Sequence, residues 1–232
     1  MSGAVVCLSG GQDSSTCLFH AVRRYDVVHA VTFDYGQRHR VELECAAALA
    51  ARADVEQAVL PVDALSMLAA GSLTNPAIES RLDAAGTGND YAEARGLPSS
   101  FVPGRNIIFL GLAAAYGIPR GLETLVAGVC STDEAGYPDC RPDFVESLQQ
   151  TIRIGMDCPE FTIDAPLLHL TKAGVWALAE ELGVVEVIRT ETHTCYEGDR
   201  GTLHDWGYGC GGCPACTTRA RGWAEYAALT KG

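Results

Sequence analysis

The residues best suited to chemistry form one short run, residues 9–15 (Ser-Gly-Gly-Gln-Asp-Ser-Ser), directly after the apolar segment 4–8. This order predicts a buried strand that turns sharply into a helix at about 16–24. Paired glycines permit a tight turn close to a ligand, and the amides that open a helix favour an anion. The run therefore predicts a phosphate-binding loop, with a turn that binds no ligand as the alternative.

The loop is not a Walker A loop, because no Gly-Lys-Ser/Thr follows at the required spacing. Its carboxylate, Asp13, is placed to reach a hydrated magnesium ion. The alternative for Asp13 is a helix-end carboxylate that the helix dipole stabilises.

A second chemical feature is a group of four cysteines near the end of the chain: Cys195, Cys210, Cys213 and Cys216. Four thiolates at this spacing suit tetrahedral zinc and leave no open position for catalysis. An iron–sulfur cluster and a redox-active Cys-x-x-Cys pair are the alternatives. His193 and His204 flank the group, and we expect neither to be a ligand.

Alternating strand and helix patterns surround the loop. We expect further strands at 27–33, 57–62 and 125–129, and helices at 38–53, 107–116, 170–183 and 217–229. Such alternation predicts an α/β fold, a doubly wound parallel sheet that binds its ligand beyond the carboxyl ends of the strands. Thr171 is the expected N-cap of its helix and Gly183 the expected stop.

The expected organisation is a nucleotide-binding α/β domain at 1–186 and a zinc-binding module with a helix at 187–232, packed on the same domain. Periodicity disappears at 69–101, where we expect a flexible excursion near the active site, with plain disorder as the alternative.

The chain is acidic, with 17 Lys and Arg against 29 Asp and Glu, a net charge of −12 over 232 residues. This charge disfavours extended binding to tRNA or DNA. No signal peptide and no run approaching eighteen apolar residues is present, so we expect a cytoplasmic protein without a membrane segment. The remaining six cysteines are then expected to be reduced.

The loop resembles the PP-loop of ATP pyrophosphatases, which grips the pyrophosphate of ATP. Further strings at 33–39 (Phe-Asp-Tyr-Gly-Gln-Arg-His), 102–106 (Val-Pro-Gly-Arg-Asn), 136–142 (Gly-Tyr-Pro-Asp-Cys-Arg-Pro) and 194–196 (Thr-Cys-Tyr) narrow the choice. Together they resemble the 7-cyano-7-deazaguanine synthase family of queuosine precursor synthesis, over about residues 4–223. The span from Cys195 to Cys210 is longer than in some members.

This resemblance implies that ATP, ammonia and 7-carboxy-7-deazaguanine become 7-cyano-7-deazaguanine through an adenylated carboxylate and an adenylated amide. It implies one structural Zn²⁺ per chain, Mg²⁺ with ATP, and a catalytic group of Lys172, Asp13 and Ser14. We expect a homodimer. The implied ATP-binding residues are Leu8, Ser9, Gly10, Gly11, Gln12, Asp13, Ser14, Ser15, Thr16, Cys17 and Leu18.

A deazaguanine ring with a carboxylate needs both acceptors and donors. The segments 101–106 and 131–141 supply both, and Gln37 and Arg38 could reach either the nucleotide or the substrate. The candidate substrate-binding residues are Gln37, Arg38, Arg105, Asn106, Asp133, Asp139 and Arg141. An internal Asp139–Arg141 ion pair that only holds the loop is the alternative for those two residues.

Three alternative functions would each explain some of these motifs. A PP-loop enzyme acting on tRNA is disfavoured by the acidic charge. A non-enzymatic zinc module leaves the loop at 9–15 without a role. A glutamine-dependent amidating ligase requires a second domain, so the ammonia must be free or delivered.

Overall fold

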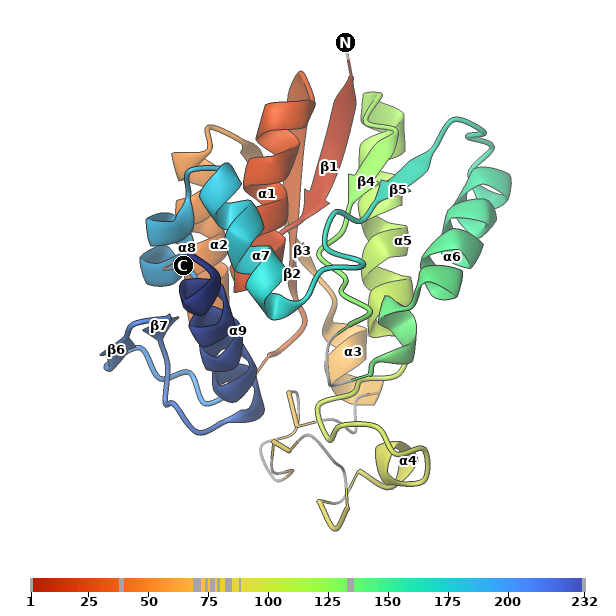
Figure 1. Cartoon of the computed structure of the whole chain (residues 1–232). Coiled ribbons are helices and arrows are strands. Elements are labelled where there is room, and N and C mark those ends of the chain that lie inside the picture. Colours follow the sequence, from red (N-terminus) through yellow and green to blue (C-terminus); the bar gives the residue numbers. More distant parts are fainter. Residues whose placement is uncertain are drawn as a thin grey trace.

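A five-stranded parallel sheet forms the centre of the molecule (Figure 1). The computed structural model describes residues 2–37, 40–68, 72–73, 75, 78, 80–81, 85–87, 89–132 and 136–230. The strand order is β3-β2-β1-β4-β5, and every pairing is parallel. The strands are β1 (Gly3–Cys7), β2 (Val27–Asp34), β3 (Glu56–Pro61), β4 (Thr124–Val126) and β5 (Thr162–Asp164).

Helices cover both faces of this sheet. Alternate residues of β1 point to opposite sides: Val5 packs in one core with α5 and α6, whereas Ala4 and Val6 pack in another with α1, α2 and α7. The predicted doubly wound α/β fold is therefore confirmed. These helices are α1 (Gln12–Arg24), α2 (Val41–Arg52), α5 (Arg105–Gly117), α6 (Pro142–Gly155) and α7 (Lys172–Glu181).

The sequence patterns located most elements within a few residues. Helix α1 begins at Gln12, before the expected start, because the loop enters the helix without a spacer. Thr171 caps α7 as predicted, since its hydroxyl oxygen accepts from the Gly174 amide at 3.1 Å, and Gly183 follows with a φ of +70°. Strand β5 and helix α6 were not predicted. Strand β5 is only three residues long, too short to show a period.

Short elements complete the first two thirds of the chain. They are α3 (Asp63–Leu68), α4 (Asp90–Glu93) and the 3₁₀ turns η1 (Ile118–Arg120) and η2 (Pro138–Cys140). The segment at 69–101 is only partly described, and its predicted flexibility falls mainly on residues outside the described set. The described part is organised around Ser99, whose carbonyl accepts from the Ser72 amide at 3.0 Å and the Asn89 side chain at 3.0 Å. It lies beyond the carboxyl ends of the strands (Figure 1).

The last part of the chain packs on the same face as α7. It comprises α8 (Val185–Glu191), the antiparallel ribbon β6 (Leu203–His204) and β7 (Gly207–Tyr208), and α9 (Pro214–Thr230). A core that includes Trp176 of α7, Trp206 and Tyr226 joins these elements. Among the described helices, none combines the length and the apolar character needed to cross a membrane.

Candidate functional site

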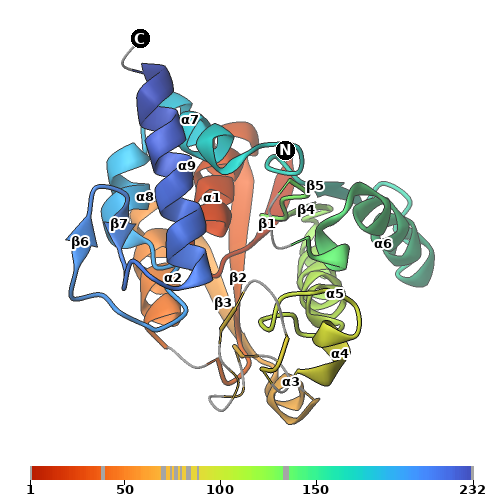
Figure 2. The same cartoon turned by 60° about the horizontal axis from the view of Figure 1, so that its bottom comes forward.

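A cavity of about 350 Å³ opens at the carboxyl ends of β1, β2 and β4. Figure 2 shows this edge between α9 on one side and the segment with α3 and α4 on the other. One wall is the predicted phosphate loop, from which Leu8, Ser9, Gly11, Gln12, Asp13 and Ser14 line the cavity. The opposite wall includes Arg105 and Tyr137. The predicted position of the ligand site thus coincides with a real cavity.

Gly10 gives the phosphate loop its shape. Its φ is +83°, and an added Cβ would lie 2.3 Å from the Glu42 carbonyl oxygen and 2.8 Å from the Ala46 amide. The close approach that requires glycine here is therefore to α2, and not to a ligand as the sequence suggested. Gly11 has an ordinary φ and does line the cavity.

The hydroxyl groups of the loop bond mainly to the loop itself. Ser14 Oγ accepts from the Ser9 amide at 3.1 Å and lies 2.9 Å from Ser9 Oγ, while Ser15 donates to the Gly11 carbonyl at 2.7 Å. The Gln12 side chain is only 3 % exposed, and its Nε2 has no hydrogen-bond acceptor within the described structure. A buried donor without an acceptor on a cavity wall is a feature that a ligand would satisfy.

The C-terminal part of the predicted nucleotide set does not reach the cavity. Cys17 and Leu18 pack in the core between α1 and the sheet, and Thr16 is fully buried with its hydroxyl donated to the Gln12 carbonyl at 2.9 Å. These three residues therefore stabilise the loop and helix α1 from the side away from the cavity, because their side chains face the sheet or the helix backbone.

Lys172, the first residue of α7, forms an ion pair with Asp13 of α1. Its Nζ lies 2.6 Å from Asp13 Oδ2, and the other carboxylate oxygen is buried without a hydrogen-bond partner among the described residues. Helix α9 passes close behind: a Cβ added at Gly222 would lie 2.5 Å from Lys172 Cβ. The fold thus brings together two predicted catalytic residues that are 159 positions apart.

On the opposite wall, a half-buried cation, Arg105, lies near a half-buried acid, Glu42. Burial opposes the charge on Arg105, yet Tyr35, Tyr137 and Asp139 keep its pKa above the ordinary value. Burial raises the pKa of Glu42 to about 7, while Arg105 acts in the opposite direction. Both side chains line the cavity. This wall is therefore an electrostatic site at which an anionic group would meet a fixed guanidinium.

Two amides of the predicted substrate set also line this cavity. Gln37 Oε1 accepts from the Tyr35 amide at 3.0 Å, so the side chain holds the turn after β2. Asn106 Nδ2 donates to the Asp139 carbonyl at 3.1 Å and thereby ties α5 to η2. Both amides therefore organise the wall.

Other predicted substrate residues have different positions. Asp139 is 7 % exposed, accepts from the Asn106 amide at 3.4 Å and does not line the cavity. Arg141 is exposed at the start of α6, and no ion pair joins it to Asp139 in the described structure. The prediction that Arg141 faces the substrate and the alternative of an internal ion pair are both unsupported here. Arg38 and Asp133 lie outside the described residues.

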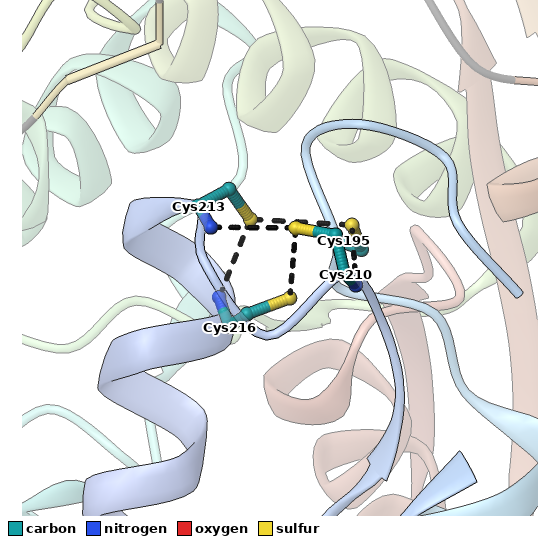
Figure 3. Close-up of side chains that lie close together, drawn as sticks. All are labelled: Cys195, Cys210, Cys213 and Cys216. Atoms are coloured by element: carbon teal, nitrogen blue, oxygen red, sulfur yellow. Dashed lines mark hydrogen bonds between the residues drawn. The ribbon is translucent and has the colours of Figure 1, made fainter. Parts of the chain in front are cut away.

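The four predicted cysteine ligands converge on one point (Figure 3). Their sulfur atoms lie within 4.8 Å of one another, with Cys195–Cys213 and Cys210–Cys216 separations of 4.0 Å. A tetrahedral ion with metal–sulfur bonds of about 2.3 Å requires sulfur separations of about 3.8 Å. The geometry therefore fits a single metal ion.

Backbone amides also point at these sulfur atoms. The Cys213 amide donates to Cys210 Sγ at 3.3 Å, and the Glu197 amide donates to Cys195 Sγ at 3.4 Å. Such bonds stabilise thiolates, the form that binds metal. His193 and His204 hydrogen-bond to backbone carbonyls, of Cys195 and Gly209 respectively, which agrees with the prediction that neither is a ligand.

Among the cavity-lining side chains that sequence reasoning missed are Glu42, Thr194 and Arg219. Glu42 lies in the first turn of a helix that was predicted, so its position near the carboxyl edge of the sheet could have been inferred from the sequence. Arg219 is 1 % exposed although its helix was expected to be amphipathic. Its burial depends on the packing of α9 against α7, which a local pattern does not reveal.

A family model and curated relatives indicate the same family for this chain. A family model described as queuosine biosynthesis protein QueC matches residues 3–227. A curated relative from Nitrobacter hamburgensis, named 7-cyano-7-deazaguanine synthase, is 49 % identical over 231 residues, covering 97 % of this chain and 95 % of the relative. A relative of the same name from Burkholderia mallei is 49 % identical over 232 residues, covering 97 % and 92 %.

Among solved structures, a 4-thiouridine synthetase in complex with RNA and bound ATP matches 99 % of this chain and 52 % of its own, with a TM-score of 0.50. The sequence identity is 13 %, so this likeness concerns the fold alone.

Proposed function

Since the chain belongs to the QueC family of queuosine biosynthesis proteins and is a ligase-type enzyme, we propose that it converts 7-carboxy-7-deazaguanine to 7-cyano-7-deazaguanine with ATP and ammonia. The observation that carries this proposal is a single cavity with two unlike walls. The phosphate loop and Lys172 form one wall, and the half-buried Arg105 faces it from the other.

The nucleotide occupies the first wall in this proposal. The loop holds the phosphates of ATP, Lys172 neutralises charge that develops as pyrophosphate leaves, and Asp13 orients Lys172 or a magnesium ion that accompanies ATP. The short Lys172–Asp13 contact supports the first of these roles for Asp13. Positioning and charge neutralisation then supply most of the catalysis.

The substrate carboxylate meets Arg105 on the second wall. A carboxylate resists attack because its leaving group would be oxide, and adenylation replaces that group with AMP. Ammonia then displaces AMP to give an amide and releases one proton. A second adenylation, on the amide oxygen, allows loss of AMP and of both N–H protons to give the nitrile. The same cavity acts twice.

We propose zinc as the metal of the cysteine cluster. The sulfur separations of 4.0 Å fit one ion, whereas a four-iron cube holds its thiolates farther apart. Cys195, Cys210, Cys213 and Cys216 would hold it, and its contribution is structural, because four protein ligands saturate it.

Incubation of the purified protein with ATP, ammonium and 7-carboxy-7-deazaguanine tests the reaction. Mass spectrometry should detect the nitrile, with two AMP released for each nitrile. Omission of ammonium should stop product formation. Accumulation of the amide as sole product, or ATP turnover that requires tRNA, would contradict the proposal.

A further inference from the structure

The chain segment that enters the cysteine cluster also runs beneath the phosphate loop. The His193 amide donates to the Gly10 carbonyl at 2.9 Å, and the Gln12 amide donates to Thr194 Oγ1 at 3.4 Å. The cysteine-rich part of the chain therefore contacts both ends of the turn that holds the phosphate.

A buried arginine fixes the position of the Thr194 hydroxyl. Arg219 Nη1 donates to Thr194 Oγ1 at 2.8 Å, while its other nitrogens donate to the carbonyls of Trp206 at 2.9 Å and Ile188 at 2.7 Å. All three groups of the guanidinium are thus engaged. Arg219 is 1 % exposed, so this arrangement is rigid.

The hydrogen-bonding capacity of a hydroxyl determines which further bond Thr194 can form. A threonine hydroxyl has two acceptor positions and one proton to donate. The Gln12 amide and Arg219 occupy both acceptor positions, and within the described structure that proton has no acceptor. Because Thr194 lines the cavity beside Gln12 and Asp13, a ligand bound there can accept its proton.

We propose that Thr194 is a further nucleotide-binding residue, whose hydroxyl, held by Arg219 and the Gln12 amide, donates a hydrogen bond to a phosphate oxygen of ATP. The inference rests on the proposed function only in taking ATP as the ligand. Donation from Arg219 polarises the hydroxyl and strengthens it as a donor. The buried Nε2 of Gln12 is a second donor beside it that a phosphate would satisfy.

The test is nucleotide affinity, measured by calorimetry on the zinc-loaded protein without substrate. Thr194→Val keeps the shape of the side chain and removes the hydroxyl, and it should weaken binding of ATP and of pyrophosphate roughly ten- to a hundredfold. Adenosine should bind as it does to the parent. Thr194→Ser should restore ATP affinity to within about threefold of the parent, because it restores the proton.

Thr192→Val is the matched control. Thr192 is also buried in this segment, but its hydroxyl donates to the Ile188 carbonyl and it does not line the cavity. It should leave ATP affinity unchanged. If Thr194→Val does not unfold cooperatively, Thr194→Ala, which also lacks the hydroxyl, replaces it.

Parent-like ATP affinity in the hydroxyl-free variant would overturn the inference, as would equal losses for ATP and adenosine. Nucleotide binding is measured without turnover, so failure of the proposed reaction leaves this result interpretable.

Discussion

The two walls of the cavity are built in different ways. The wall proposed to bind the nucleotide (the nucleotide wall) is formed largely by one short run, residues 8–14, in which the hydroxyls of Ser9 and Ser14 bond to each other. The opposite wall combines Glu42 of α2, Arg105 of α5 and Tyr137, the residue before η2, and its two charged groups are half-buried. A phosphate site can be encoded in a local turn, whereas a site for a particular substrate requires several elements to meet.

The nucleotide wall also contains residues from distant parts of the chain. The nucleotide wall is completed by Lys172 from α7 and by Thr194 and Arg219 from the cysteine-rich part of the chain. The positive charge on this wall therefore comes from distant segments, even though its backbone and the carboxylate of Asp13 belong to one short run.

The largest effect should come from Lys172→Ala. Loss of the ammonium group removes charge neutralisation at the phosphates and leaves Asp13 as an unpaired carboxylate beside them, so kcat should fall roughly a hundred- to a thousandfold. AMP release under saturating substrates measures it. Arg221→Ala, a surface cation on α9, is the control and should behave like the parent. Equal activity of the two variants would remove Lys172 from the nucleotide wall.

Arg105→Ala tests the opposite wall. The KM for 7-carboxy-7-deazaguanine should rise roughly ten- to a hundredfold, because a charged hydrogen bond to the carboxylate is lost. The KM for ATP should stay within about twofold. Steady-state kinetics with each substrate varied in turn separates the two. A parallel rise in both constants would show that the walls are not distinct.

Cys210→Ser should remove the metal with little loss of packing, because Cys210 is the exposed member of the cluster. Since metal binding contributes to folding, we expect a loss of about 2 kcal/mol or more, or roughly 4–8 °C in Tm. ATP affinity should fall more than substrate affinity, because the cysteine-rich segment contacts the phosphate loop. Metal analysis and calorimetry provide the measurements, and iron with a visible absorption band in the parent would contradict the zinc assignment.

The smallest effect concerns Glu42 and pH. Burial raises the pKa of Glu42 from 4.5 to about 7, so between these values the folded chain keeps a proton that the unfolded chain has released. Stability should therefore fall as pH rises from 4.5 to 7, and the cost is complete above about pH 7. Glu42→Gln should flatten this part of the Tm profile. Glu44→Gln, an exposed acid in the same helix, should leave the slope unchanged, and parallel profiles would contradict the assignment.

Much of the architecture could be predicted from the sequence because its signals are local. The alternation of strands and helices predicted the doubly wound sheet, and Thr171 and Gly183 marked the ends of α7 through capping geometry. The cysteine spacing predicted a cluster whose sulfur atoms do converge. These features depend on residues within one turn, one strand or one short loop.

The tertiary structure decided which charged groups share the cavity. Asp139 and Arg141 lie two residues apart, yet one is buried against Asn106 and the other is exposed, because η2 turns the chain between them. Gly10 must be glycine because a Cβ there would collide with the backbone of α2, and no local sequence pattern indicates that contact. Glu42, Thr194 and Arg219 reach the site only because their elements pack at the carboxyl edge of one sheet. Packing between distant elements therefore determines which charged groups meet at the cavity, whereas the spacing of neighbouring residues determines the backbone conformation of a turn or a helix end.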